Sequence, residues 1–238
     1  MDVLGGRSLT IVGAGRMGSA LAEALTKAGV TVVGPVRRNE PVRGDLILFV
    51  VPDREIAVAA ASAPTGAVVG HTAGAMTLDV LAPREAFSFH PLMTASEGRT
   101  VFAGASAAVA GSTHRALEIA RAIATRLAME PLTIPDSNRA AYHAAASIAA
   151  NFLVTLESMA ARVGAAGGLE RRHLLPLARA ALENWGARGP AALTGPIVRG
   201  DSDVVKQHRA AVLAAAPDLI PAWDAMAALT AAIAHDGK

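Results

Sequence analysis

The sequence predicts an α/β protein in which a doubly wound parallel sheet is followed by a smaller all-helical domain. Short apolar runs alternate with helical segments through the first half of the chain, as in repeated β–α units. A glycine-rich turn at residues 13–18 follows the first of these runs. After Pro135-Asp136-Ser137, a proline followed by two good N-cap residues, no convincing strand remains. We therefore place an α/β domain at residues 1–135 and a helical domain at residues 136–238.

Hydrophobic patterning defines the individual elements. The run Leu46–Val51 is apolar throughout, as expected for a parallel strand that is buried on both faces. Strands are expected at Ser8–Val12, Val30–Val33, Leu46–Val51, Ala67–Gly70, Ala86–Phe89, Ala105–Ala110 and Pro131–Ile134. Helices are expected between them at Gly18–Ala28, Arg54–Ala61 and Thr113–Leu127. The second domain is expected to contain helices at Ser137–Val163, Arg171–Trp185, Asp203–Ala215 and Leu219–Ala234.

Composition excludes several classes of protein. Hydrophobic residues make up 52% of the chain, which excludes intrinsic disorder. The chain has no cysteine, so disulfides, zinc–thiolate sites and thiol nucleophiles are excluded, and we expect no metal site. The net charge is +2 and no block of basic residues stands out, so we expect no nucleic-acid partner. No signal peptide is visible and the unbroken apolar runs are too short for a membrane span, so we expect a soluble, cytoplasmic protein.

The strongest motif is the GxGxxG pattern formed by Gly13, Gly15 and Gly18, with Arg16 and Met17 between the last two glycines. It follows a strand and opens a helix, which is the context that indicates dinucleotide binding. The first glycine permits a tight turn, the second lets a pyrophosphate approach the backbone, and the third lets the helix pack closely on the sheet. N–H groups at the start of the helix then bind the phosphates. The motif predicts a Rossmann-type site; the alternative is a tight turn without a ligand.

The end of the second strand indicates which dinucleotide binds. An NAD site usually has an acidic residue there, which accepts a hydrogen bond from the ribose 2′-OH. This chain has no acid at that place and has Arg37 and Arg38 instead. Two guanidinium groups suit a 2′-phosphate, so we expect NADP(H) rather than NAD(H). The alternative is that both arginines are solvated loop residues.

Several segments together resemble one family. They are GAGRMGSAL at 13–21, LFVVPD at 48–53, VVGHTAG at 68–74, SFHPLM at 88–93, RAAYHAAASIAANFLVTL at 139–156 and TGPIVRGD at 194–201. They resemble the bacterial Rossmann-like proteins with a C-terminal helical domain of the DUF2520 type. These are distant relatives of pyrroline-5-carboxylate reductase, ketopantoate reductase and the 6-phosphogluconate dehydrogenase group. The resemblance implies a nicotinamide-dependent reductase or dehydrogenase, with ketopantoate reduction a suggested activity for some members.

Ligands of doubly wound sheets bind at the carboxyl ends of the strands, and three segments lie there. The resemblance implies that Val51, Pro52 and Asp53 run beside the cofactor ribose and nicotinamide. His71 and His90 follow the next two strands. We assign His71 to cofactor contact and His90 to catalysis, since hydride transfer to a carbonyl or imine needs a proton donor near neutral pH. The alternative is that both histidines make backbone hydrogen bonds at the strand ends.

The long helix has a stripe of polar side chains. His143, Ser147, Asn151 and Thr155 are spaced four residues apart in an otherwise apolar helix, so they lie along one face. Buried polar groups need partners, so the stripe faces either a ligand or neighbouring helices. We assign His143 as proton donor, Asn151 as the residue that orients the substrate, and Ser147 to substrate binding. Tyr142 is a second candidate for the proton donor, but it lies about 100° away from His143 around the helix, so packing is its expected role.

One related mechanism does not transfer to this chain. The resemblance implies a lysine on this helix as general acid, as in ketopantoate reductases and β-hydroxyacid dehydrogenases. No lysine lies between Lys27 and Lys206. His143 is therefore our substitute for the proton donor.

The loop TGPIVRGD at 194–201 links two helices. Arg199 suits a substrate carboxylate because its planar guanidinium matches the two oxygens, and Thr194 lies in the same loop. Asp201 or Ser202 is expected to cap the following helix. The alternative is an ion pair of Arg199, either with Asp201 or with a residue of the other domain that it braces.

These features together predict an NADP(H)-dependent oxidoreductase that reduces a small carboxylate-bearing ketone or imine, ketopantoate-like or cyclic, in a cleft between the domains. The alternative is a dinucleotide-binding sensor or scaffold without turnover; a reductase with another hydride donor, such as a deazaflavin, is a further one. The alanine-rich helical domain is expected not to cover itself, so we expect a homodimer formed through it.

Overall fold

The computed structural model describes residues 3–4, 6–95 and 100–236. Parallel strands with buried apolar side chains form the core of the first part of the chain. Contacts divide the chain into two units, Met1–Ile148 and Ala149–Lys238. The change from strands to helices falls at residues 134–136, where we placed the domain boundary, whereas the units divide within the long helix.

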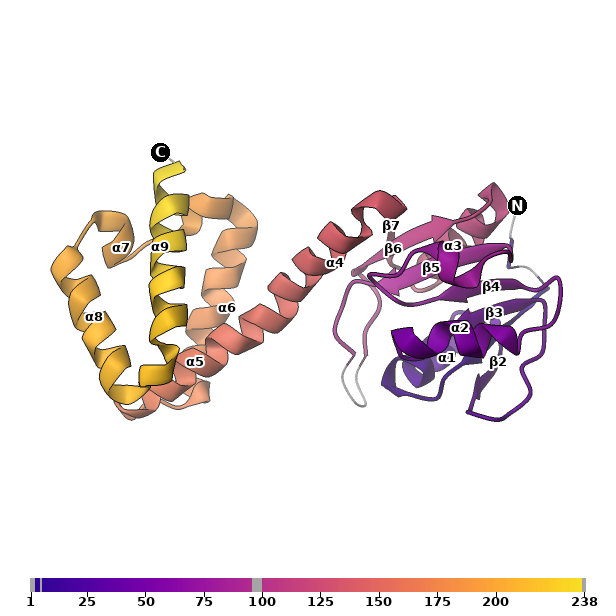
Figure 1. Ribbon diagram of the computed structural model, residues 1–238, viewed down its shortest axis with the longest axis horizontal. Helices are drawn as coiled ribbons and strands as arrows, with labels where there is room; N and C mark the ends of the chain where they lie inside the picture. The colour runs from indigo at the N-terminus through magenta and orange to yellow at the C-terminus, as the bar shows by residue number, and fades with distance from the viewer. Residues whose placement is uncertain (1–2, 5, 96–99, 237–238) are drawn as a thin grey trace. The chain divides into compact units, whose positions relative to one another are not determined.

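The described residues of the first unit form a seven-stranded sheet of order β2-β1-β3-β4-β5-β6-β7 (Figure 1). Its strands are β1 (Ser8–Val12), β2 (Thr31–Val36), β3 (Leu46–Phe49), β4 (Val68–His71), β5 (Ala86–Pro91), β6 (Ser106–Gly111) and β7 (Glu130–Thr133). Each expected strand is present, with ends shifted by at most a few residues.

The sheet is not fully parallel, which corrects one detail of the prediction. The pairs from β2 to β5 are parallel and β6 pairs with β7 in parallel, but β5 and β6 are antiparallel. A parallel return needs a crossover that is usually helical. The described part of the connection between β5 and β6 contains no helix, so the chain turns back beside the strand it has just left.

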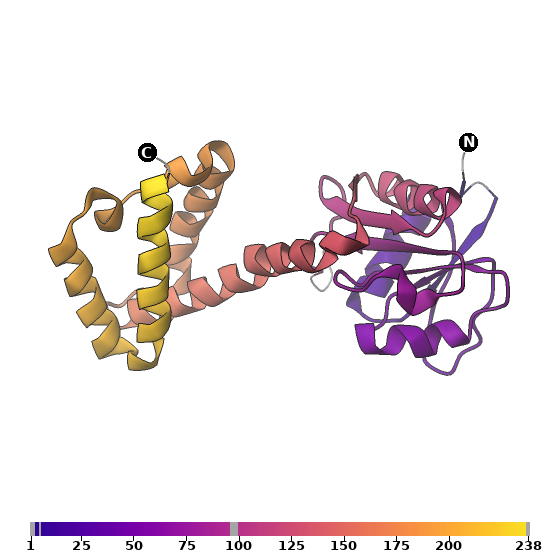
Figure 2. The same cartoon turned by 45° about the horizontal axis from the view of Figure 1, so that its top comes forward.

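Helices cover both faces of this sheet, as Figure 2 shows. The helices α1 (Arg16–Lys27) and α3 (His114–Arg126) pack in one core with apolar side chains of β1, β3 and β5. On the other face α2 (Ile56–Ala61) packs in a second core with Ile47 and Phe49 of β3. Alternate side chains of β3 thus enter opposite cores, because successive residues of a strand point to opposite faces.

The strand order positions the functional loops. The chain passes from β1 to β2 on one side and then crosses to β3 on the other side of β1. The strand order therefore reverses at β1, which is the topological switch point of the sheet. Because β1, β3, β4 and β5 are parallel neighbours, their carboxyl ends meet at one edge. The loops that follow these strands therefore converge there.

The long helix that follows the sheet is not regular. It consists of α4 (Arg139–Ser147), a π-helical turn (Ile148–Phe152) and α5 (Leu153–Ala165). The predicted polar stripe assumed a constant 3.6 residues per turn, and residues 148–152 depart from that value because a π-helical turn holds more residues. The common face of the stripe stays a prediction.

The second unit is helical throughout its described residues. Besides α5 it contains α6 (Arg171–Arg188), α7 (Pro196–Arg199), α8 (Ser202–Ala215) and α9 (Ile220–Asp236), and α8 and α9 lie side by side (Figure 1 and Figure 2). Of the residues described in this unit only Val212 and Ala216 are buried. Its helices therefore leave most of their apolar surface uncovered.

One helical stretch in the described part of the chain, Asp136–Ala165, has the length and the hydropathy of a membrane span. None of its most apolar window is buried. Length and composition alone do not separate a span from a helix that packs against protein, so this stretch is weak evidence for a membrane.

Candidate functional site

The glycine-rich turn has the geometry that a dinucleotide needs. Gly13 has φ of +118°, and a Cβ there would collide with the backbone oxygen of Val50. A Cβ on Gly18 would collide with the oxygen of Gly13, so this glycine permits α1 to pack against the turn. A Cβ on Gly15 would meet nothing within 4 Å, so space remains open where a phosphate would approach. The first N–H groups of α1, at Arg16 and Met17, lie next to that space and have no partner within the helix.

The two arginines after β2 differ in their contacts. Arg38 Nη2 lies 2.7 Å from Glu55 Oε2, and the Arg38 side chain is 76% exposed. The Arg37 backbone N–H donates to Glu40 Oε2, and its guanidinium forms no ion pair among the described residues. An exposed pair such as Arg38–Glu55 contributes at most about 1 kcal/mol, so a phosphate can replace the carboxylate. The Arg37 guanidinium can bind a phosphate directly, and the Arg38 guanidinium can bind one after the phosphate displaces Glu55.

Three residues after β3 hold the places expected of them. Val51, Pro52 and Asp53 follow the strand at the carboxyl edge of the sheet, and Asp53 begins a short 3-10 turn. Pro52 and Asp53 are exposed, as residues beside a ligand space must be. Their contact with a cofactor stays a prediction.

The structure brings together three histidines that lie far apart in the sequence. His71 ends β4, His90 lies near the end of β5, and His143 comes from α4. The rings of His90 and His143 lie 5.9 Å apart, edge to face. We call His71, His90, Tyr142 and His143 the histidine cluster.

Tyr142 belongs to this cluster, where it both packs on His90 and forms a hydrogen bond with it. Its Oη lies 2.7 Å from His90 Nδ1, and the two rings are perpendicular with centroids 5.6 Å apart. Neighbouring residues of a helix point about 100° apart, but His90 lies where both Tyr142 and His143 contact it. The sequence signal was available, since Tyr142 adjoins His143 in the motif.

Gly74 explains why the cluster packs so closely. A Cβ at this buried glycine would collide with His143 Cδ2 and stand 3.0 Å from His90 Nε2. The backbone of the loop after β4 therefore lies directly against both imidazoles. The glycine of the HTAG segment marks this contact in the sequence.

Arg139 is a buried cation that sequence reasoning missed. Its side chain is 1% exposed, its Nε lies 2.9 Å from Asp136 Oδ1, and its Nη2 donates to the Ser88 hydroxyl. Its Nη1 is buried without a hydrogen-bond partner. A buried charge is costly unless it is paired. Arg139 therefore fixes the start of α4 to β5. The sequence feature that could have identified it is its position as the last charged residue before the uncharged residues 140–156.

Burial sets the protonation of the cluster. It lowers the pKa of His71 to about 4, with a further contribution from the charge of Arg139. Burial likewise lowers the pKa of His90 to about 4, helped by His143 and Arg139. Burial raises the pKa of Tyr142 to about 12. At neutral pH both histidines are therefore uncharged and the phenol keeps its proton.

His71 serves the structure of the loop. Its Nε2 lies 3.3 Å from the Thr77 carbonyl oxygen, which can only accept, and its Nδ1 is buried without a partner. It is fully buried, so a ligand would reach it only after the loop moved. Its predicted cofactor contact is not favoured by this geometry.

The remaining predicted residues lie in or beside the second unit. Asn151 falls in the π-helical turn, and its backbone oxygen accepts from the Thr155 hydroxyl at 3.0 Å. Thr194 and Arg199 are exposed. The alternative ion pair between Arg199 and Asp201 does not form, since Asp201 Oδ1 caps α8 by accepting from the Val204 N–H. The roles of Ser147, Asn151, Thr194 and Arg199 stay predictions.

Solved structures share this fold. A protein of Bacteroides fragilis described as an NADP oxidoreductase matches with a TM-score of 0.82 at 20% identity, over 94% of this chain and 98% of its own. A protein of Thermotoga maritima matches with a TM-score of 0.78 at 24% identity, over 96% and 99%. Pyrroline carboxylate reductase of Plasmodium falciparum, solved with NADP bound, matches with a TM-score of 0.60 at 15% identity, over 96% and 98%.

Sequence comparison gives a narrower result. No curated protein sequence matches the chain significantly. The model of the domain of unknown function DUF2520 matches residues 105–230, which is more than half of the chain. With its Rossmann-like sheet and helical C-terminal region, the chain belongs to the DUF2520 family.

Proposed function

We propose that this protein is an NADP(H)-dependent reductase of a small carboxylate-bearing ketone or imine, such as a ketopantoate-like substrate or a cyclic imine. The observation that supports it most is one edge of the sheet, where the glycine-rich turn after β1 and the histidines of β4 and β5 converge. The fold shared with an NADP-bound pyrroline carboxylate reductase supports the same reaction class. Fold alone is compatible with many functions, so the proposal depends on the site.

The turn at residues 13–18 would bind the pyrophosphate. The open space at Gly15 admits it, and the first N–H groups of α1 donate to it. Arg37, together with Arg38 once released from Glu55, would bind a 2′-phosphate, which favours NADP(H) over NAD(H). NADPH, when bound, supplies the hydride.

The histidine cluster would stabilise and protonate the substrate atom that gains negative charge during hydride transfer. A carbonyl oxygen gains negative charge as hydride adds to its carbon, so a fixed hydrogen-bond donor stabilises the transition state. His90 is partly buried and neutral, which suits a donor that does not itself ionise. His143 is exposed and its ring lies 5.9 Å from that of His90, so it remains our candidate for the residue that supplies the proton the oxygen needs.

The substrate carboxylate needs a cation. Arg199 remains our candidate, because its guanidinium is exposed and forms no ion pair among the residues that the structure describes. Asn151 and Ser147 remain candidates for orienting the substrate. Replacing Arg199 by Met is expected to raise KM for a carboxylate substrate and to leave NADPH binding unchanged.

The experiment is a survey of NADPH oxidation with 2-oxo acids and cyclic imines. We expect turnover with at least one of them and a loss of about 10²-fold in kcat for H90Q, the usual size of an acid–base contribution. The matched control is H173Q, which changes a histidine of the second unit. Tight NADPH binding with no turnover on any substrate would favour the alternative, a sensor or scaffold without catalysis.

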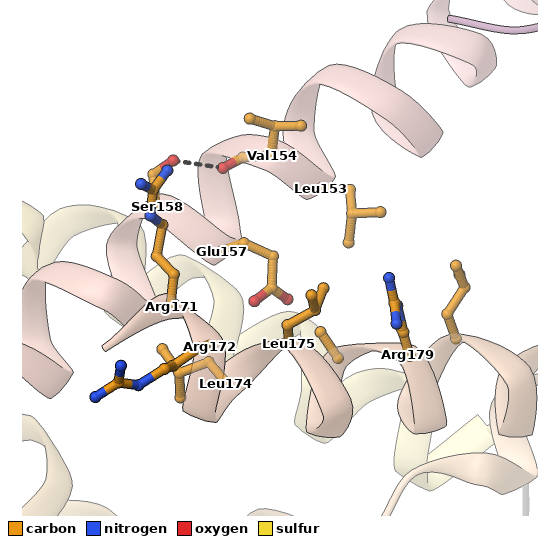
Figure 3. A pocket seen from close by; sticks show the side chains of 11 residues that line it. Leu153, Val154, Glu157, Ser158, Arg171, Arg172, Leu174, Leu175 and Arg179 are labelled. Carbon is orange, nitrogen blue, oxygen red and sulfur yellow. Dashed lines mark hydrogen bonds between the residues drawn. The ribbon is translucent and has the colours of Figure 1, made fainter. Parts of the chain in front are cut away.

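We also propose that the protein is a homodimer formed through the helical unit. A groove of about 540 Å³ between α5 and α6 is lined by leucines, among them Leu153, Leu175 and Leu182 (Figure 3). Glu157 of α5 and Arg179 of α6 lie in the same groove. A face with leucines and both signs of charge can pair with its own copy about a two-fold axis. A unit with so little core of its own needs a partner that is always present, which favours a second copy of this chain.

A further inference from the structure

The hydrogen bond between Tyr142 and His90 bears on which ring nitrogen of His90 carries a proton, a point that the proposed function leaves open. Tyr142 keeps its proton, because burial raises the pKa of its phenol to about 12. The phenol oxygen lies 2.7 Å from His90 Nδ1, and it has no other hydrogen-bond partner among the residues that the structure describes. A phenol O–H can donate to an unprotonated ring nitrogen, and a phenol oxygen can accept from a protonated one. When Tyr142 donates, His90 Nδ1 accepts, and the single ring proton of the neutral imidazole sits on Nε2.

The charged and titratable groups around His90 keep it neutral. Those that act on it are His143 and Arg139 from the long helix and His71 from β4, and all three oppose its protonation. No carboxylate is among them. Burial adds to their effect, so the pKa of His90 is lowered to about 4. A doubly protonated ring is therefore not available at neutral pH.

The other ring nitrogen is on the side of the loop after β4. His90 Nε2 stands 3.0 Å from the place that a Cβ on Gly74 would take, and the His143 ring lies beside it. The Gly74 backbone packs against this side of the ring, but Nε2 is not among the fully buried side-chain atoms that lack a partner. The tautomer thus decides whether Nε2 offers a proton or a lone pair.

We propose that Tyr142 is a positioning residue that holds His90 as the Nε2–H tautomer and thereby selects a substrate with an uncharged carbonyl oxygen over a protonated imine. This inference rests on the proposed function and narrows its substrate class. A carbonyl oxygen accepts a hydrogen bond from Nε2–H. The N–H of an iminium ion needs an acceptor instead, and the charge of the nearby Arg139 opposes a second cation.

The chemistry balances with the groups named. As hydride forms the new C–H bond, the π electron pair of the carbonyl moves to oxygen, where His90 Nε2–H donates to it. The oxygen then takes a proton that comes from water by way of the exposed His143. His90 keeps its own proton throughout, so Tyr142 never needs to ionise.

The first test is nuclear magnetic resonance of the ¹⁵N-labelled protein without cofactor or substrate. Long-range ¹H–¹⁵N correlations distinguish a protonated ring nitrogen from an unprotonated one, and the signals that vanish in H90Q belong to His90. We expect a protonated Nε2 and an unprotonated Nδ1 near neutral pH, and a mixture of tautomers in Y142F. A protonated Nδ1 in the wild-type protein would overturn the proposal, whether or not the protein turns over any substrate.

The second test uses turnover. We expect the wild-type protein to prefer 2-oxo acids to cyclic iminium substrates, and Y142F to lower kcat on the oxo acid by about 10-fold with little change in KM, below the range of a group that transfers the proton itself. H173Q is again the matched control. Preference of the wild-type protein for the iminium substrate would overturn the substrate class. Absence of all turnover with the expected tautomer would refute the proposed function and leave the tautomer assignment standing.

Discussion

At the scale of single residues, Arg139 and Ser88 show how a buried charge is accommodated. The Ser88 hydroxyl accepts from Arg139 Nη2, while Arg139 Nη1 already lacks a partner. Replacing Ser88 by Ala leaves a second guanidinium nitrogen unpaired, so we expect the free energy of unfolding to fall by about 1–3 kcal/mol in denaturant titrations. The control is Ser62→Ala, at an exposed hydroxyl, which should cost about 0.5 kcal/mol or less. Equal stability of the two variants would contradict this role.

The same residues mark the limit of prediction from sequence. His71, His90 and the glycine-rich turn can be predicted because each follows a strand, and His143 because it belongs to a row of polar side chains in an apolar helix. Arg139 was missed because an arginine is usually solvated, and only the packing of α4 on β5 shows that this one is buried. Tyr142 was assigned to packing because its helical direction was compared with that of His143 alone, without the position of His90.

At the scale of elements, the turn between β1 and α1 separates two roles of glycine. Gly15 has φ of −74° and open space around it, so Gly15→Ala should keep the melting temperature and weaken NADPH binding. A Cβ on Gly18 meets the backbone of Gly13, so Gly18→Ala should lower the melting temperature as well. Thermal melts and NADPH titrations of both variants check this. A stable Gly18→Ala variant with full binding would contradict the close packing of α1.

Most elements follow from local pattern, and two features do not. Apolar runs such as Leu46–Phe49 and the amphipathic α3 fix strands and helices within a few residues. The direction of β6 depends on a connection without a helix, which periodicity does not reveal. The π-helical turn at Ile148–Phe152 is likewise invisible in a pattern that assumes a constant helical period.

At the scale of the whole molecule, the neutral histidines make stability depend on pH. The pKa values of His71 and His90 are about 4 in the folded protein against 6.5 for an ordinary histidine, so between these values the unfolded chain binds protons that the folded chain does not. Stability is full above about pH 6.5 and falls as the pH drops toward 4, by on the order of 3 kcal/mol for each histidine. Denaturant unfolding near pH 7 and pH 5 measures this. His71→Gln should flatten the dependence, and an unchanged slope would contradict the burial argument.

The exposed apolar surface of the helical unit predicts association. Leu175 is 48% exposed in the groove between α5 and α6, and Leu175→Glu should convert a dimer into a monomer in sedimentation experiments. Val58→Glu is the matched control, since Val58 is 77% exposed on α2 of the first unit and should leave the dimer intact. A wild-type monomer at micromolar concentration would contradict the proposal.

The central claim is that one edge of the sheet binds NADP(H) and presents its reactive end to the histidine cluster. A crystal structure of the complex with NADP⁺ tests it most directly. We expect the pyrophosphate against residues 13–18, the 2′-phosphate at Arg37, and C4 of the nicotinamide beside His90. A dinucleotide bound away from the glycine-rich turn, or a nicotinamide remote from His90 and His143, would contradict it.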